Sequence, residues 1–543
     1  MSVHNRIVLP FVLITLALLA GCGSSTPAAT PPPGGSFSKS DLKGTYVFST
    51  SGLDPNFFYF TMTGMITADG NGGISGGTID INDSDAVNPI QAFGQAISTS
   101  SNYSVGVDGR GQINVVSPLG KSTFDFVLNS SAGGLITEFD GNGTGSGTLE
   151  LQTATITQAQ MMQGYAFSLT GTDAGGSNPL SGAGAFTLDV NGNIIAGTGV
   201  HDYNDAGIIY SASPLSGSVT LDAGGGSGKA ILATALGTLN FNFYVIDANH
   251  VKLIETDLLP SVPVLSGDAF LQAAIPTGTL VFTMAGDSSA GPLALGGFMT
   301  SSGAGQTSNG LEDENAGGLV SSVQIPFQLN YAAPVNGRSA LVLTNFSGGP
   351  TQLAVYPFTN GSKTGLLMLE TDGNALAAGV AYLQTNTALA TPPQGYGLNL
   401  TGVSGVGSSP FELDDIAEFQ TTSAGNMTGL LDENDQGSPV NPQAIVDTGS
   451  TPSSFVQDSP VTGRGEAQFN TNGANTLFDM IFYTVDGTNT LFIEDDSTQV
   501  AVGTFQLQNS GVKKTGAAAR PLPVRPMAMP HPALRHSHVV SGK

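Results

Sequence analysis

The chain has 543 residues, enough for roughly three to five domains of about 100–200 residues each. Its 74 glycines and 30 prolines occur beside 40% hydrophobic residues, a composition that excludes both a disordered polymer and a largely helical fold. The single cysteine, Cys22, excludes an intramolecular disulfide and a cysteine-based metal site. A formal net charge of −25 argues against nucleic acid as a partner.

The first segment, residues 1–21, has the organisation of an export signal peptide. Arg6 provides a basic start, residues 7–19 form an apolar stretch, and the small residues Ala20 and Gly21 follow. The apolar stretch is too short to cross a bilayer, which needs about 20 residues. We therefore expect this segment to direct export and to be removed.

The four residues Leu19-Ala20-Gly21-Cys22 resemble the lipobox of bacterial lipoproteins. This resemblance covers only the first 22 residues. It implies cleavage before Cys22, which then carries diacylglycerol and an N-linked acyl chain, and several acyl chains anchor a protein firmly in a membrane. Because Gly23 and not Asp follows the cysteine, the resemblance favours the outer membrane of a Gram-negative cell. Residues 22–43 then form a tether rich in Ser, Pro and Gly, of which 23–38 could extend about 50 Å.

Four sequence markers recur in the same order four times along the body of the chain. Each copy opens with a glycine before an apolar strand and closes with Leu-Gln, and an Asp-x-Asn and a Glu-x-Asp lie between them. The sequence therefore predicts four homologous domains, at residues 44–152, 164–272, 278–384 and 395–508. The opening glycines are Gly44, Gly164, Gly278 and Gly395, and the closing glutamines are Gln152, Gln272, Gln384 and Gln508.

Each copy has the pattern of antiparallel β-structure. Phe124, Phe126 and Leu128 alternate with polar residues, and pairs such as Asp69-Gly70 supply the positive φ angles of tight hairpins. We predict an all-β fold of four tandem antiparallel domains, each a small up-and-down barrel of about eight strands filled by its own side chains. A β-sandwich and a β-propeller with two blades per repeat are the alternatives.

The last segment, residues 509–543, differs from the rest in its charge. It holds six Lys or Arg residues and neither Asp nor Glu. This composition predicts a disordered basic tail, which could fold back on the acidic domains or contact anionic envelope polymers.

The repeated acidic pairs are the candidate metal ligands. In an up-and-down meander both pairs of a copy would lie at one end of the domain, and Ca²⁺ prefers clustered carboxylate and amide oxygens. The alternative is that these side chains cap hairpin backbones. The candidate residues are Asp80, Asn82, Glu138 and Asp140 in the first copy, Asp202, Asn204, Glu255 and Asp257 in the second, Asp313, Asn315, Glu370 and Asp372 in the third, and Asp432, Asn434, Glu494 and Asp496 in the fourth.

One basic residue also recurs, after a glycine at the turn before the fifth predicted strand. It is Arg110, Lys229, Arg338 or Arg464, depending on the copy. We hypothesise that the basic end of one domain contacts the acidic end of its neighbour, with solvated turn residues as the alternative.

Motifs of catalytic sites are present only in unsuitable contexts. The sequence of residues 73–77 fits G-x-S-x-G but lies in a glycine-rich hairpin, and residues 223–230 resemble a phosphate-binding loop that lacks its first Gly and its final Ser or Thr. The only histidines of the body, His201 and His250, are both in the second copy. We therefore predict no enzymatic activity and no catalytic residue.

These observations together predict a surface-exposed repeat lipoprotein with a structural, adhesive or envelope-binding role. Its partners would be the membrane, through the anchor at Cys22, and envelope polymers or other surface proteins. The alternative is a protein that binds a small ligand or Ca²⁺ at one site per domain; no other cofactor is expected.

Overall fold

The computed structural model describes residues 30–510, apart from 34, 86, 88, 154, 177, 322, 347–350, 448–451, 460 and 472–476. Within this range the chain is all-β, as predicted, and the strands pair antiparallel. Two short 3₁₀-helices, η1 (Lys39–Asp41) and η2 (Gln158–Met161), precede the first and second sets of strands. The predicted signal peptide, Cys22 and residues 511–543 lie outside the described residues.

The strands form four consecutive sets of nine, called here units 1 to 4, and each set coincides with one copy of the sequence markers. Unit 1 consists of β1 (Lys43–Leu53), β2 (Tyr59–Asp69), β3 (Ile74–Asp83), β4 (Ala92–Ala96), β5 (Asn102–Val105), β6 (Arg110–Ser117), β7 (Gly120–Ser130), β8 (Gly133–Glu138) and β9 (Thr144–Leu151). Unit 2 consists of β10 (Gly164–Thr172), β11 (Pro179–Thr187), β12 (Val200–Asp205), β13 (Ile208–Pro214), β14 (Ser216–Leu221), β15 (Ser227–Thr234), β16 (Gly237–Asp247), β17 (His250–Glu255) and β18 (Val264–Gln272).

The second half of the chain continues the same order. Unit 3 consists of β19 (Gly278–Ser288), β20 (Gly291–Ser301), β21 (Thr307–Ala316), β22 (Leu319–Val320), β23 (Ile325–Tyr331), β24 (Ser339–Thr344), β25 (Gln352–Asn360), β26 (Lys363–Glu370) and β27 (Leu376–Leu383). Unit 4 consists of β28 (Gln394–Ser404), β29 (Phe411–Thr421), β30 (Met427–Asp435), β31 (Ser438–Ile445), β32 (Ser454–Val456), β33 (Arg464–Asn470), β34 (Leu477–Asp486), β35 (Asn489–Glu494) and β36 (Gln499–Leu507).

Every unit is a meander whose first strand pairs with both its second and its last strand, as β1 does with β2 and β9. The count of nine differs from the expected eight because the fourth strand is broken. In unit 1 the turn at residues 97–101 divides it, so that β4 pairs with β3 and β5 pairs with β6. In unit 3, β23 pairs with both β21 and β24, and the eight strands other than β22 close into a complete barrel.

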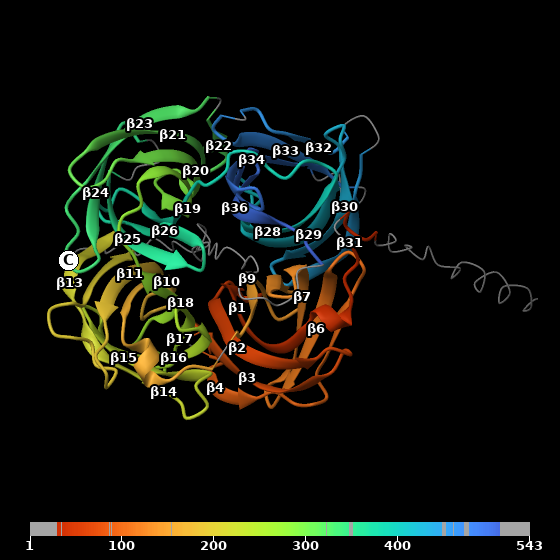
Figure 1. The fold of residues 1–543 in the computed structure, drawn as a ribbon. Helices are drawn as coiled ribbons and strands as arrows, with labels where there is room; N and C mark the ends of the chain where they lie inside the picture. Colours follow the sequence, from red (N-terminus) through yellow and green to blue (C-terminus); the bar gives the residue numbers. More distant parts are fainter. Residues whose placement is uncertain are drawn as a thin grey trace, which may run out of the picture.

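The four units lie around a common centre, in a ring that Figure 1 shows from red (unit 1) through yellow and green to blue (unit 4). The first and last strands of the units lie near the centre, and the broken fourth strands lie on the rim. The central strands are buried on both faces, so residues 366–369 of β26 (Leu-Leu-Met-Leu) are apolar without alternation. On the rim, β15 alternates strictly between buried and exposed residues, as a strand with one face in water does.

Each unit has its own apolar core inside its curled sheet. A further cluster of buried residues joins units 2, 3 and 4 across their boundaries. Two residue pairs between β18 and β25 also connect the sheets of units 2 and 3 into one sheet of 18 strands. No helix in the described part of the chain is of the length and apolarity that a membrane crossing requires.

Candidate functional site

The Asp of each Asp-x-Asn marker lies at a boundary between units and binds side chains of the next unit. Asp202 of unit 2 accepts hydrogen bonds from Nε (2.6 Å) and Nη2 (2.8 Å) of Arg338 in unit 3. Asp313 of unit 3 accepts the equivalent bonds from Arg464 of unit 4, both at 3.2 Å. The ring closes with Arg110 of unit 1, whose Nε lies 3.1 Å from Asp432 of unit 4. These contacts confirm the hypothesis of basic-to-acidic contact for three of the four basic residues.

A buried tyrosine of the same neighbour completes two of these contacts. The hydroxyl groups of Tyr356 and Tyr483 donate to Asp202 and Asp313, the second at 2.6 Å. Gly296 makes room for the tyrosine at the second boundary, because a Cβ there would lie 2.5 Å from a ring carbon of Tyr483. The glycine is therefore required by close approach and not by its own φ angle.

The fourth basic residue, Lys229, acts on Asp80 of unit 1 through its charge, which opposes the rise that burial causes in the pKa of Asp80. It does not occupy the position of the three arginines. Arg464 lies opposite Tyr483, whereas Ser227 lies opposite the equivalent Tyr244, and Lys229 is exposed two residues later in the strand. The hydrogen bonds to Asp80 come from Nδ2 of Asn242 (2.9 Å) and the hydroxyl of Tyr244 (2.8 Å).

The Asn of each Asp-x-Asn marker binds the Glu-x-Asp region of the next unit, and this contact occurs at all four boundaries. The side-chain amide donates to the main-chain carbonyl of the marker Glu in every case. The four pairs are Asn82 with Glu255 at 2.8 Å, Asn204 with Glu370 at 3.3 Å, Asn315 with Glu494 at 3.0 Å, and Asn434 with Glu138 at 2.7 Å.

The closing Leu-Gln marker also connects neighbouring units. The residue after each glutamine donates its main-chain N–H to a carbonyl of the next unit, and the last of these bonds returns from unit 4 to unit 1. The four bonds are Thr153 to Ile246 (3.0 Å), Ala273 to Pro357 (3.0 Å), Thr385 to Val485 (2.9 Å) and Asn509 to Asn129 (2.7 Å). The repeated markers are therefore the joints of a closed ring.

The Asp of each Glu-x-Asp marker caps the backbone of its own unit. Asp140 accepts the N–H of Thr123 at 2.8 Å, and Asp257 accepts that of Asn240 at 2.8 Å. Asp372 binds Gln352 N–H at 2.7 Å, and Asp496 binds Gln499 N–H at 2.8 Å. Capping of turns, the alternative reading of these residues, describes them correctly.

Burial at the boundaries raises the pKa of the marker glutamates. Desolvation, followed by the nearby Asp257, raises the pKa of Glu255 to about 9. Desolvation, followed by the nearby Asp372, raises the pKa of Glu370 to about 8. Burial also raises the pKa values of Glu138 and Glu494 well above the ordinary range. Burial at the joints therefore favours the protonated form of these side chains.

The expectation that the acidic pairs gather at one end of each domain is wrong, since Asp-x-Asn faces the following unit and Glu-x-Asp the preceding one. Many of their oxygens already receive arginine, tyrosine, amide or main-chain donors, although Glu138 Oε2 and Asp432 Oδ1 have no hydrogen-bond partner within the described residues. Within the described residues, no group of three or more His, Cys, Asp or Glu side chains is placed to hold a metal ion.

The interiors of the units offer little room for a ligand. The lumen of unit 2, lined by Phe167, Phe186 and Phe243, contains a cavity of about 20 Å³. A second cavity, of about 40 Å³, lies where units 2, 3 and 4 meet and is lined by Asp268, Phe270 and Val502 among others. The first volume accommodates about one or two water molecules and the second about three, because one needs about 10–15 Å³ of such space.

A cluster of buried charges lies at the boundary of units 1 and 2, and the sequence reasoning did not find it. Lys252 Nζ contacts Glu150 Oε1 (3.1 Å), Asp268 Oδ1 (3.1 Å) and Thr148 Oγ1 (2.7 Å). His250 Nε2 lies 2.9 Å from Asp268 Oδ1, and its Nδ1 lies 3.5 Å from Glu150 Oε2. The four ionisable side chains are at most 2% exposed, and we call them the buried quartet.

The quartet balances two bases against two carboxylates. Burial lowers the pKa of His250, but the carboxylates of Glu150 and Asp268 outweigh that effect, and the net shift is upward. The His250 ring also stacks on Phe270 with centroids 4.4 Å apart. His201, the other histidine in the body of the chain, does not belong to the quartet. Its Nε2 accepts the N–H of Ala235.

Both ends of the described chain lie at the boundary between units 4 and 1. Gln420 of unit 4 donates to the carbonyls of Thr30 and Pro31 at 3.1 Å, and Phe37 is buried in the core of unit 1. A Cβ at Gly35 would lie 2.5 Å from Oγ of Ser510. Part of the predicted tether therefore rests on the ring, and the reach of about 50 Å expected for a free segment is wrong.

No family model and no curated protein matches this sequence. Among solved structures, it is similar to a transferrin-binding protein B (TbpB) mutant from Haemophilus parasuis, with 9% identity, a TM-score of 0.20 and coverage of 70% of this chain and 83% of that one. Intact Ap-TbpB, with N and C lobes, gives 9% identity, a TM-score of 0.17 and coverage of 86% and 95%. A protein of unknown function from the DUF3598 family of Nostoc punctiforme has 10% identity and a TM-score of 0.14, with coverage of 42% of this chain and 96% of that one. Scores this low assign no function to this chain.

Proposed function

We propose that this protein is a lipid-anchored, non-enzymatic platform of the bacterial cell envelope. In this proposal the four units are homologous β-barrel domains that present the rim of the ring to envelope polymers or other surface proteins. The observation that carries it is ring closure, because unit 4 contacts unit 1 through the same marker residues that join the other units.

The small size of the internal cavities supports a role in which partners bind to the outer surface of the ring. The two cavities of about 20 and 40 Å³ are far below the roughly 300 Å³ of a typical ligand site. The buried quartet is shielded from solvent, so a substrate has no access to its ionisable groups. Four equivalent rim surfaces on one anchor multiply weak contacts through effective concentration.

The position of the chain ends supports anchoring at one defined boundary. Seven residues lie between Cys22 and Thr30, and this stretch spans at most about 30 Å when fully extended. A ring anchored through Cys22 would therefore stay close to the membrane, with the boundary of units 4 and 1 facing the lipid. The six basic residues that follow position 510 in the sequence would add attraction to anionic headgroups.

The anchor is tested by the substitution Cys22→Ser in the full chain. We expect the wild-type protein to incorporate labelled palmitate and to fractionate with membranes, and the variant to do neither. A mature wild-type protein that starts downstream of Cys22 without acyl chains would refute the anchor.

The platform role is tested separately with the unacylated Cys22→Ser protein. Mixed with envelope fragments at physiological salt, it should sediment with them, whereas a protein of similar size and charge should stay in solution. If it remains in the supernatant, the binding role is wrong even when the anchor is confirmed.

A further inference from the structure

The buried quartet has a lysine at a position where the other units have leucine, and an aspartate where they have threonine or valine. Lys252 of β17 pairs directly with Asp268 of the adjacent strand β18. The equivalent pairs, counted from the marker glutamates, are Leu135 with Thr148, Leu367 with Val380 and Leu491 with Thr504. Leucine satisfies the fold at this position, so packing alone does not explain Lys252.

The surroundings of this pair exclude water and are rich in aromatic rings. Lys252 and Asp268 are each 1% exposed, and Phe270, Phe358 and Tyr382 are buried nearby in the cluster that joins the units. A buried ammonium and carboxylate are costly to desolvate. A reaction that converts both into one neutral group would remove that cost.

We propose that Lys252 and Asp268 form an intramolecular amide cross-link between β17 and β18 once the chain has folded. Lys252 Nζ lies 3.1 Å from Asp268 Oδ1, so the amine is held against the carboxyl group with which it would react. This contact keeps the amine beside the carboxyl group, and reacting groups held in such proximity gain a large rate advantage over the same groups free in solution.

Glu150 and His250 supply the proton transfers that the condensation needs. Glu150 Oε1, 3.1 Å from Nζ, accepts a proton from the ammonium, and the free amine attacks Cγ of Asp268. His250, 2.9 Å from Oδ1, donates to that oxygen as negative charge develops on it. The N–Cγ bond forms, the bond from Cγ to the other carboxyl oxygen breaks, and Glu150 transfers the two protons lost by nitrogen to the departing oxygen. Ammonium and carboxylate thus give one amide and one water, with no oxidant or reductant.

The structure also provides a place for the released water. Asp268 lines the cavity of about 40 Å³ at the meeting point of units 2, 3 and 4. That volume holds about three water molecules. The product water can therefore leave the reacting atoms without disrupting the packing.

Trypsin tests the cross-link in the wild-type full chain. Lys252 is the only Lys or Arg between Lys229 and Arg338, so an unmodified, denatured chain yields peptides 230–252 and 253–338. The cross-link blocks cleavage after Lys252, and we expect one peptide, 230–338, lighter than its sequence by one water molecule. A second protease should then release a branched peptide joining residues 252 and 268. Recovery of 230–252 and 253–338 at their unmodified masses would overturn the proposal.

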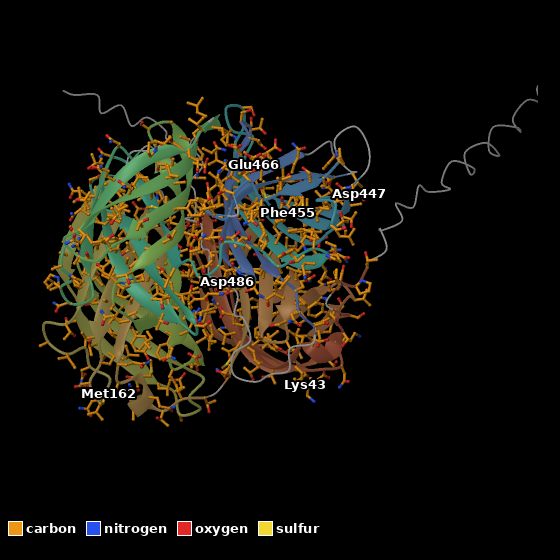
Figure 2. All side chains as sticks on the ribbon, turned by 45° about the horizontal axis from the view of Figure 1, so that its top comes forward. Lys43, Met162, Asp447, Phe455, Glu466 and Asp486 are labelled. Atoms are coloured by element: carbon orange, nitrogen blue, oxygen red, sulfur yellow. The ribbon has the colours of Figure 1, made fainter. Side chains whose placement is uncertain are left out.

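Two further measurements test the chemistry and its specificity. Glu150→Gln, close in shape to the original, should fold and give complete cleavage at Lys252, since the proton carrier is gone; a persistent cross-link would contradict the role of Glu150. The matched control is the pair of Lys363 in unit 3 and Asp486 in unit 4, 3.3 Å apart but 13% and 23% exposed (Figure 2, where Asp486 is labelled). That pair lacks the dry site, so its peptides should have their unmodified masses, and an amide there would refute the assignment of roles to the quartet.

Discussion

The joints on either side of unit 3 differ from the joints on either side of unit 1. One continuous apolar cluster, which includes Phe270, Tyr356 and Ile493, connects units 2, 3 and 4. Unit 1 meets its neighbours through much smaller clusters, such as that of Val127, Leu135 and Ile416. The Asn-to-Glu bonds and the main-chain bonds after each closing glutamine occur at all four joints, so these bonds do not account for the difference.

The joint between units 4 and 1 is instead mainly polar. Asn399 Nδ2 donates to Thr137 and Ser146 at 3.1 Å, and Thr144 donates to Asp414 at 3.0 Å. A net hydrogen bond contributes only about 0.5–1.5 kcal/mol, whereas apolar burial accumulates with area. We infer that the marker contacts fix which surfaces meet, and that the apolar cluster supplies most of the stability around unit 3.

The largest expected effect comes from removing equivalent apolar volume at the two kinds of joint. Leu369 belongs to the large cluster and Leu135 to the three-residue cluster, and both are at most 2% exposed. Leu-to-Ala changes in cores cost about 2–5 kcal/mol, and we expect Leu369→Ala at the upper end and Leu135→Ala at the lower end. Urea unfolding of both variants provides the measurement. Equal losses would show that the two joints are equally tight.

The arginine contacts offer a second way to separate the joints. Arg110→Ala and Arg338→Ala should each cost about 1.5–3 kcal/mol, since both remove charged hydrogen bonds from a buried aspartate. Only Arg110→Ala should increase protease cleavage near the chain ends, because the joint of units 2 and 3 keeps its apolar cluster. Lys229→Ala is the control, and we expect it to change stability by less than about 0.5 kcal/mol because this side chain is exposed. Equal cleavage of the two arginine variants would contradict the comparison.

The sequence predicted the β-structure because it follows from local alternation and turn residues, and the four sets of strands keep the phase of the markers. That these sets are four homologous tandem domains stays a prediction. The sequence also identified the residues of the joints, such as Asp202 and Asn204, but not their partners. Spacing along one chain does not distinguish a contact within a unit from one between units. The calcium sites stay a prediction for the same reason. Both carboxylate oxygens of Asp202 accept hydrogen bonds from Arg338, and the side-chain amide nitrogen of Asn204 donates to the carbonyl of Glu370 in the next unit.

The buried quartet escaped notice for a different reason. It occurs once, whereas the sequence search concentrated on features that occur four times. Comparison of the copies would have revealed Lys252 at the position of Leu135, Leu367 and Leu491, three residues before the marker glutamate. The broken fourth strand has no such signal, since its division depends on how the sheet curls in three dimensions.

The last prediction concerns pH and compares two buried glutamates. Glu418 lies at the joint of units 4 and 1, and Glu370 lies at the joint of units 2 and 3. Burial, with Asp108 as the next contributor, raises the pKa of Glu418 to about 8, and its buried Oε1 has no hydrogen-bond partner within the described residues. Because the folded protein favours the protonated form of Glu418, this side chain is fully compatible with folding only below the pKa that it has in the unfolded chain, near 4.5. Its contribution to stability decreases as the pH rises to about 8 and is then constant.

Glu418→Gln removes this dependence because glutamine stays neutral. The variant should match the wild type near pH 4 and exceed its stability by several kcal/mol at pH 9, because each unit of raised pKa corresponds to about 1.4 kcal/mol. Urea unfolding at both pH values provides the measurement. Glu370→Gln should show no such gain, although the pKa of Glu370 is also about 8. Glu370 Oε1 accepts the N–H groups of Asp372 and Asn374, and its other oxygen accepts Asn204, so the new amide would place one donor against another. A gain from both substitutions would mean that burial alone, and not the bonding of each carboxylate, sets how the two joints respond to pH.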